Sequence, residues 1–193
     1  MTIYHPTNTQ VLTRRKFART SLIPLSQDYL WQIESGVVRG MTWMEDGTCI
    51  ILGLWGTGDI VGRALSTSNP YQIECLTEVQ ANLLPAAIWY QSTDAIILHT
   101  QRLGEFLEIV HCKPIEVSLL RLMNWLAKRF GRETEQGQLI DLRLTHQEIS
   151  EILGSSRVTI TRMINDFEKQ GIIHRLGRKL IVAQDQPFWH YEI

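Results

Sequence analysis

The segment from Leu142 to Val182 restricts the fold more than any other part of the chain. It contains two short amphipathic patterns separated by a glycine turn and followed by a small hairpin pattern. Thr145 and Glu148 form a T-x-x-E capping box, which predicts that the first helix begins at this point. That helix has one apolar stripe at helical spacing, formed by Ile149, Ile152 and Leu153.

The second helix is predicted to follow Gly154, a residue that tolerates positive φ, with Ser155 or Ser156 as its cap. Its inward face is apolar and consists of Ile160, Met163, Ile164 and Phe167. Its outer face is mostly polar or basic and consists of Arg157, Val158, Thr161, Arg162 and Asn165. This layout predicts a winged helix-turn-helix, a motif that places its second helix in the DNA major groove.

A basic hairpin completes the pattern. Gly171 ends the second helix, and short strands are predicted at Ile172–His174 and Lys179–Val182. The tip between the strands contains Arg175, Gly177, Arg178 and Lys179. An ordinary helical subdomain is the alternative interpretation, but these features in this order favour DNA binding. The chain has a net charge of −1, so a basic face on this segment matters more than bulk charge.

At these residues the chain resembles the Crp/Fnr family of bacterial transcription regulators, and the helix opening SSRVTITR is most similar to the cyanobacterial nitrogen-control branch. The resemblance implies base contacts from Arg157, Val158, Thr161 and Arg162. It implies backbone contacts from Thr145, His146, Gln147, Ser155, Ser156, Thr159, Arg175, Arg178 and Lys179. It also suggests an inverted repeat of the form GTA-N8-TAC. Cyclic-AMP-responsive members usually have glutamate at the position of Val158, so their operator does not carry over.

The region before the helices has a β pattern. Short β-rich runs alternate with glycine or polar turns, which predicts a small antiparallel barrel or jelly roll. The predicted strands are Tyr29–Ile33, Val37–Met44, Thr48–Trp55, Asp59–Val61, Tyr71–Thr77 and Gln80–Leu84. Only Phe17 to Gln27 is expected to supply the front of the roll. This order of strands and turns resembles the sensor roll of the same family.

The expected effector pocket departs from the family pattern. A cyclic-nucleotide site needs a carboxylate for the ribose hydroxyl and an arginine for the cyclic phosphate. The chain has Arg63 where the carboxylate is expected and Asn69–Tyr71 where the arginine is expected. We therefore expect no cyclic-nucleotide binding. If a small metabolite acid binds instead, Arg39 and Arg63 are the candidate partners.

Two helices are predicted to join the halves. In residues 93–111 an a/d seam at alternating spacings of three and four consists of Ile96, His99, Leu103, Phe106 and Val110. The resemblance implies that this is a dimerisation helix. The alternative is a helix that packs on its own roll. Both uses are compatible, because Ile97, Leu107 and Ile109 form further apolar surface on the same helix. Pro114 is expected at the N1 position of a second helix, whose C-terminal Lys128 and Arg129 suit the helix dipole. A polar linker is expected at Gly131–Gly137.

The sequence argues against other functions. No run of apolar residues approaches the length of a membrane span. The pair Arg14-Arg15 resembles a twin-arginine export signal but lacks the apolar segment that such a signal needs. We therefore expect a cytoplasmic protein in which this basic segment is mobile or lies at the edge of a sheet. Three scattered cysteines do not suit an iron–sulfur cluster, and no catalytic arrangement is legible. Neither a metal nor another cofactor is therefore expected. A role for His99 or His111 in haem binding stays open, though surface or interface residues are the commoner case.

The sequence therefore predicts an α+β homodimeric transcription regulator. It would contain a β-roll at residues 1–92, a dimerisation helix at 93–112 and a winged helix-turn-helix at 113–193. Its partners would be double-stranded DNA, a second copy of the chain and RNA polymerase. Two alternatives stay open: a roll that binds a partner protein, and a ligand-gated sensor. The aromatic residues Phe188, Trp189 and Tyr191 predict a C-terminal segment that packs on the body or on a partner.

Overall fold

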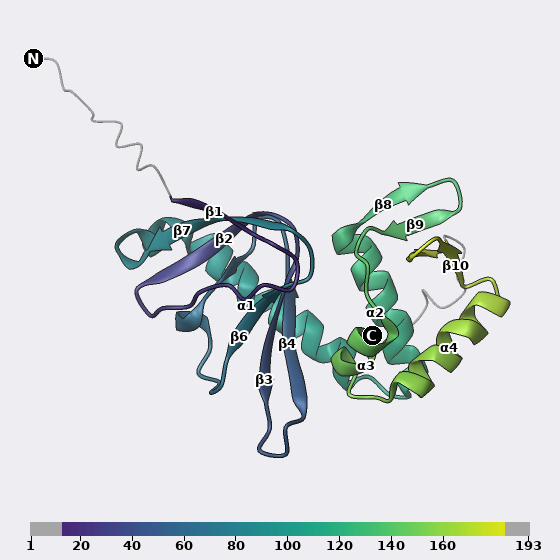
Figure 1. The fold of residues 1–193 in the computed structure, drawn as a ribbon. Helices are drawn as coiled ribbons and strands as arrows, with labels where there is room; N and C mark the ends of the chain where they lie inside the picture. Colours follow the sequence, from purple (N-terminus) through teal and green to yellow (C-terminus); the bar gives the residue numbers. More distant parts are fainter. Residues whose placement is uncertain (1–12, 184–193) are drawn as a thin grey trace, which may run out of the picture.

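The computed structural model describes residues 13–183, in which a roll of two antiparallel sheets lies beside a helical domain with a small sheet of its own (Figure 1). The aromatic C-terminal segment of residues 184–193 lies outside the described residues. Among residues 13–183 no helix is both long and apolar enough to cross a membrane. The expectation of an α+β architecture with an N-terminal antiparallel roll is confirmed.

The roll follows the predicted strand pattern closely. One sheet has the order β1-β7-β2-β5, with β1 at Arg14–Phe17, β7 at Val79–Pro85, β2 at Tyr29–Ser35 and β5 at Ile60–Val61. The other has the order β4-β3-β6, with β4 at Cys49–Trp55, β3 at Val38–Trp43 and β6 at Gln72–Cys75. Two short 3-10 helices follow β5 and β7, η1 at Arg63–Leu65 and η2 at Ala86–Ser92.

The front of the roll begins earlier than the sequence analysis predicted. The basic run from Arg14 is itself a strand, and it pairs with β7 from Arg14 opposite Asn82 to Phe17 opposite Val79. It lies at the edge of its sheet, which confirms the strand-edge interpretation of this segment. Exposed basic side chains at a sheet edge oppose pairing with another chain.

Large aromatic side chains fill the roll and determine where glycine is needed. Trp31 and Trp55 are both fully buried. A Cβ atom added to Gly40 would lie 2.7 Å from the Trp55 ring, and one added to Gly53 would lie 2.8 Å from it. These two neighbouring strands therefore need glycine at both positions to leave space for the indole.

The long helix α1 (Thr93–His111) has the predicted bounds, but its a/d seam faces its own roll. His99 is only 4% exposed; it stacks on Trp55 with ring centroids 4.9 Å apart, and its Nδ1 lies 2.9 Å from the Ile60 carbonyl oxygen. Phe106 is 3% exposed, and the other three predicted positions are half-buried against the same chain. The assignment of His99 and Phe106 to a partner interface is therefore wrong.

The exposed face of α1 is the predicted seam displaced by one residue. It contains Ile97, Thr100, Gly104, Leu107 and His111, which repeat the same alternating spacing of three and four. Ile97 is 51% exposed and Leu107 is 57% exposed. A Cβ at Gly104 would meet no atom within 4 Å, so the helix backbone is open to close approach at its centre. The spacing was predicted correctly, but the exposed row lies one residue further along the chain than the predicted seam.

The second half of the chain begins with α2 (Ile115–Phe130), which Pro114 precedes as the N-cap rather than as N1. The expected polar linker is instead a hairpin of β8 (Gly131–Thr134) and β9 (Gly137–Ile140). It joins the wing strands β10 (Ile173–Leu176) and β11 (Lys179–Val182) in one sheet of order β10-β11-β9-β8. Backbone pairing with β11 explains why this polar segment is ordered.

One apolar cluster extends across both halves of the chain. From the roll it contains Val37, Met41, Ile51, Leu54 and Leu76, and it continues through α1 and α2 to the helix-turn-helix and the wing. In Figure 1 the helix α3 (His146–Ile152) lies between the roll and α4 (Arg157–Lys169). The position of the helix-turn-helix against the roll is thus held by buried side chains.

Candidate nucleic-acid interface

The first helix of the helix-turn-helix begins where the capping box predicts. The Thr145 hydroxyl accepts a hydrogen bond from the Glu148 amide at 3.1 Å, and the Glu148 carboxylate accepts one from the Thr145 amide at 2.6 Å. Two backbone donors at the helix start are satisfied in this way. The cap fixes the first residue of α3 and therefore the point at which the helix-turn-helix begins.

The second helix α4 is held by its cap and by its apolar face. Gly154 has a φ of +58° in the preceding turn, which supports its predicted role. The Ser156 hydroxyl accepts a hydrogen bond from the Thr159 amide at 3.0 Å, so Ser156 rather than Ser155 is the cap. All four residues of the predicted inward face are buried, namely Ile160, Met163, Ile164 and Phe167.

The opposite face of α4 is exposed, and the helix itself lies on the far side of its domain from the roll (Figure 1). Val158 is 78% exposed, which is unusual for an apolar side chain and leaves it available for contact with a partner. Arg157 and Arg162 are also exposed, and neither forms an ion pair within residues 13–183. The structure thus brings an apolar group and two guanidinium groups together on one helix surface.

Two predicted contact residues hold the helices together instead of pointing freely outward. The Thr161 hydroxyl donates to the Arg157 carbonyl at 2.8 Å, and the His146 Nδ1 lies 2.8 Å from the same hydroxyl oxygen. Burial lowers the pKa of His146, and the charges of Arg175 and Arg157 lower it further. A neutral imidazole therefore joins the start of α3 to α4, a role that the sequence analysis missed because it depends on the crossing of two helices.

The wing carries fewer free charges than predicted. Arg175 donates to the Asn165 side-chain oxygen at 2.7 Å and forms an ion pair with Glu168 at 3.1 Å, so it braces α4. Lys179 is paired with Asp141. Arg178 is exposed at the tip beside Gly177, where φ is +60°. Of the three predicted wing cations, Arg178 is the one that forms no ion pair in the described part of the chain.

The prediction that Arg39 binds an effector is wrong, because its guanidinium group is already paired within the protein. Its Nε lies 2.7 Å from Glu74 of β6, and its Nη1 lies 2.9 Å from Glu151 of α3. Burial alone would lower the pKa of Arg39, but hydrogen bonds and charges from both glutamates outweigh burial and raise it. Arg39 therefore connects the roll to the first helix of the helix-turn-helix.

Arg63, the other effector candidate, is the first residue of η1. Its guanidinium donates to the Ser68 carbonyl, which fixes the loop after η1. The neighbouring Tyr71 is half-buried, and its removal from water raises its pKa to about 12 although the Arg63 charge acts in the opposite direction. Among residues 13–183 no group of three His, Cys, Asp or Glu side chains is arranged to hold a metal ion.

The fold and this surface define a winged-helix regulator that presents one helix to DNA. Residues 119–187 match the Crp-like helix-turn-helix domain. The chain is 42% identical over 181 residues to the regulatory protein CysR of Synechococcus elongatus, covering 91% of this chain and 86% of that protein. It is 32% identical over 88 residues to the global nitrogen regulator of the same organism, covering 46% of this chain and 38% of that protein.

A solved CRP-family transcriptional regulator from Thermus thermophilus has the same fold, with a TM-score of 0.75 at 22% identity, covering 88% of this chain and 91% of that one. The chain belongs to the Crp/Fnr family, and it is a transcription regulator of the Crp/Fnr type with a DNA-binding helix-turn-helix. The resemblance predicted from the sequence is thereby confirmed at the level of the family.

Proposed function

We propose that the protein reads an inverted repeat in duplex DNA as a homodimer, with Arg157, Val158 and Arg162 as the residues that contact bases. The exposed outer face of α4 carries this proposal. An arginine pairs bidentately with guanine, and an exposed valine suits contact with a thymine methyl group. The hydroxyl of Thr161 already donates within the helix, so only its methyl group and oxygen lone pair remain for a base contact.

The remaining contacts are assigned to the phosphate backbone. Arg178 at the wing tip and Gln147 at the start of α3 are exposed near the two ends of the motif. The other backbone candidates are Thr145, His146, Ser155, Ser156, Thr159, Arg175 and Lys179. Several of these side chains have partners within the protein, which supports a role in fixing the position of the backbone rather than in reading sequence.

The homodimer is proposed to form through the outer face of α1. Dimerisation is the behaviour of the family, and this face offers Ile97 and Leu107 on either side of Gly104. A second α1 related by a two-fold axis would cover both apolar side chains and approach closely at the glycine. Two recognition helices would then enter major grooves about one helical turn, 34–36 Å, apart.

The effector and partner assignments follow the same reasoning. We propose that cyclic nucleotides do not bind, because the place of the ribose carboxylate holds Arg63, whose guanidinium is bound to the Ser68 carbonyl. RNA polymerase is the proposed further partner, since regulators of transcription act at promoters. A DNA-binding regulator of this kind would act in the cytoplasm, where the chromosome lies.

Selection of random duplexes by the full-length protein tests the proposed reading. The wild type should enrich an inverted repeat with half-sites of the form GTA, as in GTA-N8-TAC. Arg157→Ala should lose the preference for guanine, worth about 1–3 kcal/mol per bidentate contact. Val158→Glu should move the preference towards a pair that presents cytosine, because glutamate accepts a hydrogen bond from cytosine N4.

Gln147→Ala is the matched control, since a backbone contact affects all sequences about equally. Binding should also weaken steeply with added salt, because phosphate contacts release counterions. Absence of an enriched repeat in the wild type would overturn the proposal. An unchanged motif in Arg157→Ala would refute the assignment of that residue.

A further inference from the structure

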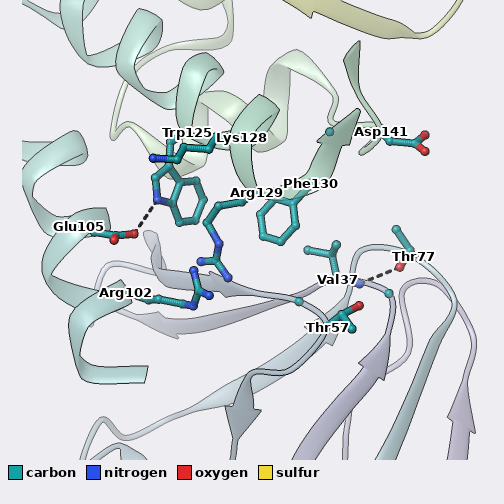
Figure 2. Close-up of a pocket in the computed structure, with 13 residues that line it drawn as sticks. Val37, Thr57, Thr77, Arg102, Glu105, Trp125, Lys128, Arg129, Phe130 and Asp141 are labelled. Atoms are coloured by element: carbon teal, nitrogen blue, oxygen red, sulfur yellow. Dashed lines mark hydrogen bonds between the residues drawn. The ribbon is translucent and has the colours of Figure 1, made fainter. Parts of the chain in front are cut away.

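A cavity of about 700 Å³ lies where the roll meets α1 and α2 (Figure 2). Three loops of the roll form its floor, around Gly36, Gly56-Thr57 and Thr77, and Arg102 of α1 lines one side. The C-terminal turn of α2 covers it with Trp125 and Arg129. Ligand pockets in proteins have volumes of roughly 300–1,000 Å³, so the cavity is large enough for a metabolite.

Two guanidinium groups converge on one carboxylate at this junction. Arg102 Nε lies 2.7 Å from Asp59 Oδ1, and Arg129 Nη2 lies 2.6 Å from Asp59 Oδ2. Asp59 is 1% exposed, and its Oδ2 also accepts a hydrogen bond from the Gly56 amide at 2.7 Å. One buried negative charge therefore balances only one of the two positive charges.

Arg102 lines the cavity and has donors that are not used by the protein in the described residues. Arg102 approaches Asp59 through Nε, and within residues 13–183 its two terminal nitrogens form no hydrogen bond or ion pair. Arg129, by contrast, is held between the rings of Trp125 and Phe130, with its central carbon 4.8 Å and 5.0 Å from the ring centroids. Figure 2 shows the two guanidinium groups side by side among the residues that line the cavity.

The acidic residues that line the cavity have partners of their own. Asp141 is paired with Lys179, and Glu105 accepts a hydrogen bond from the neutral Trp125 indole at 3.1 Å, which orients this carboxylate but leaves its negative charge in place. Lys128, exposed on α2, adds a further positive charge at the rim. The site thus combines a guanidinium fork with free donors and a second cation, an arrangement that suits carboxylate or phosphate oxygens.

We propose that this cavity binds a small metabolite that carries a carboxylate or phosphate group, with Arg102 as the main contact and Lys128 as the second. The lining comes from the roll, from α1 and from α2, so a bound anion stabilises this arrangement of the two halves relative to any other. The site thereby links an anionic metabolite to DNA affinity. This regulatory consequence rests on the proposed function, whereas binding of the anion does not.

Calorimetric titration of the full-length protein with succinate and with inorganic phosphate, at ionic strength matched with chloride, tests the site. At least one anion should bind with a Kd below roughly 10 mM. Arg102→Gln should weaken that binding at least tenfold. Lys128→Gln should weaken it several-fold, and because Lys128 is exposed this variant is expected to keep the fold. Lys16→Gln, an exposed site on β1, is the matched control and should bind as the wild type does.

Lack of binding by both anions, or equal binding by wild type, Arg102→Gln and Lys128→Gln, would overturn the proposed site. A preference for succinate identifies a carboxylate ligand, and a preference for phosphate identifies a phosphorylated one. The same anion should change the affinity for the selected DNA repeat at least threefold. If the anion binds but leaves the DNA affinity unchanged, only the regulatory link is overturned. If the anion binds and the protein binds no DNA at all, the proposed function is contradicted, whereas the proposed anion site is still supported.

Discussion

Replacing Ile97 and Leu107 together by glutamate should convert the homodimer into folded monomers. Full burial of a leucine or isoleucine contributes about 1.5–3 kcal/mol. The two side chains are 51% and 57% exposed in the protomer, so roughly half of that amount remains to be gained on association. Four such side chains in a symmetric dimer together contribute about 3–6 kcal/mol. Their loss alone weakens the dimer Kd by about two to four powers of ten.

Sedimentation over a range of protein concentrations measures this shift, and circular dichroism checks that each variant is folded. Met44→Glu is the matched control, because Met44 is also an exposed apolar residue but lies in the β3–β4 hairpin, and this variant should stay dimeric. Phe106→Ala provides the contrast, since its buried ring contributes to the protomer itself and its loss should lower stability by about 3–5 kcal/mol.

A double variant that sediments as a dimer at the wild-type concentrations would refute the assignment of the outer face of α1. Dissociation of the Met44→Glu control would equally show that exposed apolar residues in general, rather than this row, hold the dimer.

Three further predictions concern other parts of the molecule. Burial lowers the pKa of His99, although its hydrogen bond to the Ile60 carbonyl and the nearby charge of Asp59 act in the opposite direction. In the unfolded chain this histidine therefore binds a proton near pH 6.5, whereas in the folded chain it does so only at a lower pH. Stability should therefore fall as pH falls through about 6.5 and level off below the folded pKa, and His99→Gln should flatten this dependence in urea titrations. Ser156→Ala should cost about 1 kcal/mol of stability through loss of the α4 cap, measured by the same titrations. A double-mutant cycle of Arg39→Met and Glu151→Gln should give a coupling energy of about 1–2 kcal/mol, and additive effects would refute their contact across the two halves.

Much of the fold could be predicted from the sequence because it depends on local signals. The capping box at Thr145 and the buried face of α4 are set by spacing within one helix, and the structure confirms both. The strands of the roll are punctuated by glycine and polar turns, which act over two to four residues. Each of these signals is complete within a short segment.

The errors come from features that depend on distant residues. The periodicity of α1 indicated an amphipathic helix, but two apolar rows displaced by one residue were present, and only packing on the roll decides which of them is buried. Gly131–Gly137 is polar and looks like a linker, yet it becomes a hairpin because its second strand pairs with β11. The basic C-terminus of α2 suited the helix dipole, while the partner of Arg129 is Asp59, far away in the chain.

The candidate interface shows the same division. The exposure of Arg157 and Val158 followed from helical spacing alone. The partners of His146, Arg175 and Arg39 did not, because each contact joins two elements whose relative position the sequence does not express.

The apolar cluster that continues from the roll into the helix-turn-helix has a consequence for how this regulator unfolds. Met41, Ile51 and Leu54 of the roll share one buried cluster with α2, α3 and α4, so separation of the two halves would expose apolar side chains on both, although the roll also has a buried cluster of its own around Trp31 and Trp55. Calorimetry of the intact chain should therefore record a single heat-absorption peak rather than two. Chimaeras that exchange the winged segment between family members would need to carry the matching apolar side chains of β3 and β4 with it.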